Sequence, residues 1–64
     1  MSAHQEPRRE LMALLTHRAM TNHLKAAAVS RGESALAFVL QLEADNYNES
    51  IRALRAILKA EASA

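Results

Sequence analysis

Apolar residues recur at helical spacing along most of the chain, and their pattern divides it into three segments. The cleanest stripe lies in 47–61, where large side chains follow one another every three or four residues: Tyr47, Ile51, Leu54 and Leu58. Isoleucine, valine, threonine and aromatic residues are too few and too scattered to indicate strands. The pattern therefore predicts an all-α fold of three helices, at about 7–30, 34–45 and 47–61.

The ends of the first predicted helix are marked by the single proline and the single glycine. Pro7 suits the first turn of a helix, where a missing N–H costs nothing. Gly32 suits the stop, because glycine enters the left-handed conformation of a helix C-terminus freely. Residues 1–6 are predicted to be a flexible tail, and 7–62 a single helical domain.

The apolar residues of 7–30 do not form one stripe. At 100° per residue, one arc holds Leu11, Leu15, Ala19, Ala26 and Val29. Met20, Leu24 and Ala27 lie roughly opposite this arc, and Leu14 lies away from both sets. Either the helix breaks near Thr21 and Asn22, or it stays whole and touches neighbours on two sides. We favour the unbroken helix.

The next segment, 34–45, is rich in apolar side chains, which cover about 200° of a helix surface. They are Ala35, Leu36, Phe38, Val39, Leu40 and Leu42. A helix that apolar is expected to be central and the most buried of the three. Asn46, with Glu49 three residues later, has the spacing of a capping box and predicts a new helix start. Because the connections are short, 34–45 and 47–61 should form an antiparallel hairpin.

The stretch from Asp45 to Leu54 resembles the turn and second helix of a tetratricopeptide repeat. There a small turn is followed by tyrosine, an Ala-Ile-type pair and then an aromatic residue or leucine. Phe38 stands where that repeat has a small residue, and Asp45 where its turn has glycine. The chain also holds one such unit, whereas a repeat protein needs about three to bury its core. We interpret the likeness as convergent packing of a helical hairpin.

A chain of 64 residues is short for a stable core, and it contains no cysteine that could form a disulfide. Surplus apolar surface on 7–30 and the small residues Ala26, Ala27 and Ala28 predict close helix association between copies. We therefore expect a dimeric helical bundle assembled through the first helix.

No constellation for chemistry is visible in the sequence, so we expect no enzyme, no catalytic residue, no metal site and no cofactor. A nucleophile-elbow motif is absent, and one glycine cannot build a phosphate-binding loop. His17 and His23 are six residues apart, which places them about 120° apart around one helix. The longest dense apolar run, 35–40, is far too short for a membrane span, and no secretory segment is seen, which favours a cytoplasmic protein.

The function expected is therefore that of a small, non-enzymatic protein–protein interaction module, an adaptor, regulator or accessory subunit that binds through its helices. The partner would be another protein, with a homodimer also expected. The residues expected at the protein-interaction surface are Leu11, Leu14, Leu15, Met20, Leu24 and Ala27.

The alternative is a DNA-binding transcriptional regulator that uses basic residues of the first or third helix. Arg52, Arg55 and Lys59 recur at i, i+3 and i+7, so they could contact phosphates along one helix face. The same spacing is typical of an ordinary solvated face, which we favour.

Overall fold

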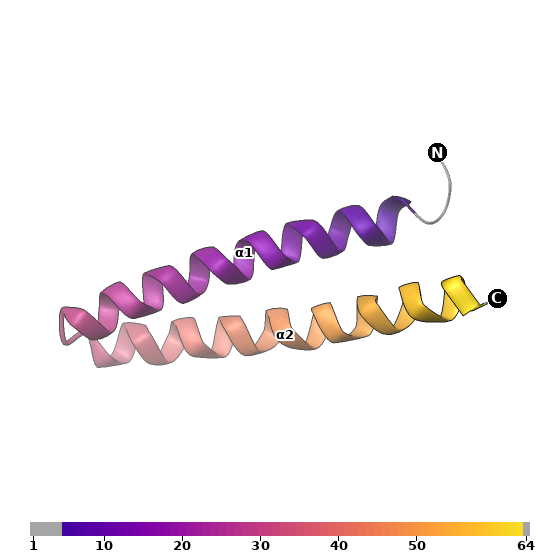
Figure 1. Cartoon of the computed structure of the whole chain (residues 1–64). Coiled ribbons are helices and arrows are strands. Elements are labelled where there is room, and N and C mark those ends of the chain that lie inside the picture. The colour runs from indigo at the N-terminus through magenta and orange to yellow at the C-terminus, as the bar shows by residue number, and fades with distance from the viewer. Residues whose placement is uncertain (1–4, 64) are drawn as a thin grey trace.

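The computed structural model describes residues 5–63 as two helices, α1 (Gln5–Ser30) and α2 (Ser34–Ser63). They lie side by side and antiparallel, so the start of α1 and the end of α2 meet at one end (Figure 1). The predictions of an all-helical chain and of an unbroken first helix are confirmed, since α1 passes through Thr21 without interruption. Of the predicted tail, residues 1–4 lie outside the described residues.

The prediction of three helices is wrong, because α2 continues where 34–45 and 47–61 were expected to separate. Asn46 does not cap a new helix, because it lies inside α2, and the side chain of its neighbour Asp45 accepts a hydrogen bond from Gln41 Nε2 at 2.8 Å, one turn earlier in the same helix. Buried residues recur every seventh position across this point: Ala37, Ala44 and Ile51. The hairpin is therefore formed by α1 and α2, and the stretch resembling a tetratricopeptide turn lies within one helix.

The turn between the helices is built around Gly32, as the sequence predicts. Gly32 has φ of 73°, the left-handed conformation that side chains disfavour. The Glu33 N–H donates to the Ala28 carbonyl at 2.9 Å, and the Gly32 N–H donates to the Val29 carbonyl at 3.1 Å. This pair of bonds is a Schellman motif, which satisfies the last carbonyls of α1 and reverses the chain.

The face of α1 that packs on α2 is a seam that alternates steps of three and four residues: Leu11, Leu14, Arg18, Thr21, Lys25 and Ala28. Half of these side chains are polar, which is why a projection of hydrophobic residues does not find the seam. Two polar members reach across to α2. Arg18 Nη1 donates to Asn48 Oδ1 at 2.9 Å, and Lys25 Nζ donates to Gln41 Oε1. Such cross-helix pairs at seam positions specify the register of the two helices.

The core of the hairpin is thin. The buried residues are Thr21, Ala28, Ala37, Leu40, Ala44 and Ile51. The segment 34–45 supplies three of these six buried residues, but the expectation that its large side chains are buried is wrong for most of them, since Phe38 and Val39 are more exposed than buried. Because α2 has a single neighbouring helix, α1 covers only one narrow stripe of its surface, and the rest of the apolar surface of α2 stays in solvent.

Candidate protein-interaction surfaces

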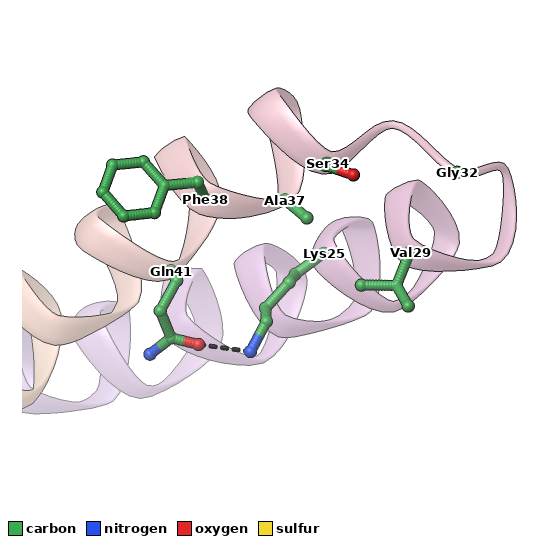
Figure 2. A pocket seen from close by; sticks show the side chains of 7 residues that line it. All are labelled: Lys25, Val29, Gly32, Ser34, Ala37, Phe38 and Gln41. Atoms are coloured by element: carbon green, nitrogen blue, oxygen red, sulfur yellow. Dashed lines mark hydrogen bonds between the residues drawn. The ribbon is translucent and has the colours of Figure 1, made fainter.

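A groove opens between the two helices beside the turn, with a volume of about 350 Å³. Val29 of α1 and Phe38 of α2 supply its apolar walls, and the bonded pair Lys25 and Gln41 closes one end (Figure 2). Ala37 has a small side chain, which leaves room between these walls. We call this site the turn groove. The turn groove combines apolar walls with the ammonium group of Lys25.

Phe38 is the most prominent feature of the turn groove. Its exposed fraction is 66%, the highest among the large apolar side chains of the described chain. A helical phenylalanine so exposed contributes little to the stability of an isolated hairpin, because most of its surface stays in water. Aromatic side chains of this kind are frequent anchors in protein interfaces.

A second hollow, of about 220 Å³, lies further along the same side of the hairpin. Arg18, Arg52 and Arg55 line it together with Asn48 and Ile51. Within residues 5–63 no ion pair involves any of these three arginines. Their positive charges are therefore not neutralised inside the hairpin.

Lys59 follows Arg52 by seven residues, so it extends this basic side toward the end of α2. We call Arg18, Lys25, Arg52, Arg55 and Lys59 the basic strip. The structure thus adds two seam residues of α1 to the three basic residues that the sequence suggested for nucleic-acid contact.

The opposite side of the hairpin carries a different set of side chains. His17 of α1 stacks on Tyr47 of α2, with ring centroids 6.0 Å apart and planes inclined by 17°. The Tyr47 hydroxyl donates to Glu43 Oε1 at 3.0 Å. Met20 and Leu24 continue the α1 part of this side toward the turn, and both are exposed.

This arrangement makes the pKa of Tyr47 testable. The hydrogen bond to Glu43 raises the pKa of the Tyr47 phenol above its ordinary value of about 10, and partial desolvation and the nearby carboxylate act in the same direction. The neutral phenol is the favoured form. Its stabilising contribution is therefore present below pH about 10 and is lost as the pH rises through the raised pKa.

Replacing Glu43 with glutamine should lower the pKa of Tyr47 toward its ordinary value, because the carboxylate acceptor and its charge are both removed. Tyr47 is the single tyrosine and the chain has no tryptophan, so phenolate absorbance near 295 nm reports this residue alone. Glu49→Gln, which removes a carboxylate that accepts no bond from Tyr47, is the control. Identical midpoints in the wild type and Glu43→Gln would show that the bond is not formed in solution.

The residues that the sequence suggested for protein interaction fall into two groups in the structure, one half-buried and one exposed. Leu11 and Leu14 are half-buried in the seam, so they help to hold α1 on α2. Leu15 and Ala27 are also half-buried, whereas Met20 and Leu24 are exposed. Sequence reasoning missed several exposed apolar residues, because it assigned them to a buried helix or to one arc of α1: Val29, Leu36, Phe38, Val39 and Leu42.

A metal-holding group of side chains and a membrane-spanning helix are both absent from the part of the chain that is described. Among residues 5–63, no group of three histidine or acidic side chains is placed to hold a metal ion. Neither described helix is both long and apolar enough to cross a membrane. The features left for a functional argument are the turn groove, the basic strip and the side that carries His17 and Tyr47.

Comparisons with known proteins add no assignment to these features. No protein family model, no curated protein and no solved structure matches this chain.

Proposed function

We propose that this chain is a non-enzymatic protein–protein interaction module that binds a helix of another protein in the turn groove. The observation that carries the proposal is the exposed Phe38 of α2, which lines the turn groove together with the exposed Val29 of α1. Interface anchors of this kind are buried by a partner, which removes apolar surface from water. A cytoplasmic setting is part of this proposal.

A helix suits this site because the turn groove and the second hollow follow one another along the two helices as an interrupted channel. An amphipathic helix laid in such a channel buries residues at i, i+3, i+4 and i+7. The partner's apolar face would lie on Val29 and Phe38. Side chains further along it would reach the second hollow beside Arg55.

The basic strip indicates that this partner helix is acidic. Arg18, Arg52 and Arg55 have no ion pair within residues 5–63, so carboxylates of a partner would meet unneutralised guanidinium groups. Complementary charge of this kind raises the association rate and selects among partners. The proposed ligand is therefore an acidic amphipathic helix rather than any apolar segment.

The test compares tagged wild-type protein with two alanine variants in affinity capture from the source cells, followed by binding measurements on the captured protein. Phe38→Ala should weaken binding about 30-fold, the change that corresponds to an interface anchor of about 2 kcal/mol. Met12→Ala is the matched control, because Met12 is 65% exposed but lies on the outer side of α1, away from the groove. Equal binding by Phe38→Ala and the wild type would contradict the proposal.

A second measurement addresses the charge of the partner. The double variant Arg52→Glu and Arg55→Glu should also lose the captured protein, and more so at low salt, where unscreened charges act over longer distances. If the wild type instead retards duplex DNA with steep salt dependence and this double variant does not, the basic strip serves nucleic acid and the proposed partner is wrong.

A further inference from the structure

We infer that the side of the hairpin opposite the turn groove is covered by a second copy of this chain, which produces a four-helix dimer. We call this side the neutral face and define it by Met20, Leu24, Leu36 and Val39. The inference uses none of the residues that form the turn groove, so the two proposals can fail separately.

The four side chains lie on the side marked by the contact between His17 and Tyr47. Leu24 follows His17 by seven residues and Leu36 precedes Tyr47 by eleven, and both intervals return a helix to within about 20° of the same direction. Met20 and Val39 flank these two positions one turn away or less. The hairpin therefore presents large apolar side chains from both helices on one side, near the turn.

The hairpin also needs more burial than it provides for itself. Its radius of gyration is 14.8 Å, whereas a compact chain of this length has about 11 Å. Polar side chains occupy the seam at Arg18, Thr21 and Lys25, and the chain has no cysteine to staple it. Small domains without disulfides or metals reach stability by association or by exceptional helix packing. Because the core of this hairpin is thin, association is the remaining source of stability.

The side of the hairpin that carries the neutral face is large enough for a stable dimer. Two paired helices about 40 Å long and each about 10 Å wide present a side of roughly 800 Å². A standard interface buries about 800 Å² on each partner. A second hairpin laid on this side would therefore reach the size of a specific interface.

Charge decides which side a second copy covers. An isologous contact sets each side against itself, so two basic strips would repel each other. Near the four residues of the neutral face lie Glu43, whose carboxylate accepts the Tyr47 hydroxyl, and Arg31 and Glu33, which form an ion pair with each other at 3.0 Å. Like-charge repulsion therefore opposes self-association much more on the basic strip, with its five positive side chains, than on the neutral face.

The test is sedimentation equilibrium of wild-type protein at about 100 µM, well above the micromolar limit of weak interfaces of this size. We expect a mass of twice the 7.0 kDa chain. Val39→Glu should give a monomer, because Val39 is 57% exposed in the hairpin but buried in the dimer. Met12→Glu, a change of similar type about 120° around α1 from Leu24, should remain a dimer.

A monomeric wild type would overturn the inference, and so would a dimer that survives Val39→Glu or is lost in Met12→Glu. If Val39→Glu loses its helical circular dichroism, the milder variant Val39→Ala takes its place in the test of dimerisation. That variant should keep its helicity and raise the dimer dissociation constant at least about 5-fold, the effect of truncating a contributing interface residue. An unchanged dissociation constant would overturn the inference.

Discussion

Replacing Ile51 with alanine should lower the free energy of unfolding by about 2–5 kcal/mol, the range for truncating a buried isoleucine. Ile51 is 2% exposed and is the largest side chain that the hairpin buries completely. Its removal leaves a cavity between the helices, and a thin core has few side chains that could refill it. Because small domains have little stability to lose, the variant should be largely unfolded at room temperature.

Urea unfolding followed by circular dichroism checks this expectation, at one protein concentration for all variants because association changes apparent stability. Met12→Ala is the control, since methionine and isoleucine have the same number of side-chain heavy atoms and Met12 is mostly exposed. It should change the unfolding free energy by no more than about 0.5 kcal/mol. A similar small effect for Ile51→Ala would mean that α1 does not pack on α2 at this position.

Replacing Ala28 with leucine should lower the free energy of unfolding by about 1–3 kcal/mol, through overpacking rather than through a cavity. Ala28 is 0% exposed and clusters with Ala37 and Leu40, where the helices meet next to the turn. The Glu33 N–H is bonded to its carbonyl, so the backbone there cannot move aside without losing the turn. A larger side chain must therefore push α1 away from α2.

Ala26→Leu is the matched control, because Ala26 is exposed two residues earlier on the same helix. Leucine and alanine have similar helix propensities, so this variant should unfold at nearly the wild-type urea concentration. If Ala28→Leu were as stable as Ala26→Leu, the close approach of the helices at Ala28 would be incorrect.

The break predicted between 45 and 46 shows where local signals mislead. Asp45 and Asn46 are frequent in caps and turns, and Glu49 completes the spacing of a capping box. Yet Ala37, Ala44 and Ile51 keep one phase through this point, and packing on α1 favours a helix that continues. Neither glycine nor proline interrupts the segment. The seven-residue interval is present in the sequence, but two of its three members are alanines, whose small side chains do not stand out in a pattern of large apolar residues.

The candidate surfaces were predictable only in part. Exposure of Met20 and Leu24 agrees with the surplus apolar surface seen on the first helix. The turn groove was not foreseen, because Phe38 was expected in a buried central helix. How much of an apolar helix is covered depends on the number of helices that pack against it, and that number cannot be read from the sequence.

The sequence by itself determined the helical class and the position of the turn. These are local properties: helix propensity acts residue by residue, and Gly32 reverses the chain because glycine tolerates positive φ. Tertiary structure alone decided the seam, since Arg18 and Lys25 become core-facing only when Asn48 and Gln41 lie opposite to accept their hydrogen bonds. It also decided which apolar side chains remain exposed, because burial depends on the partner helix and not on the hydrophobicity of the residue.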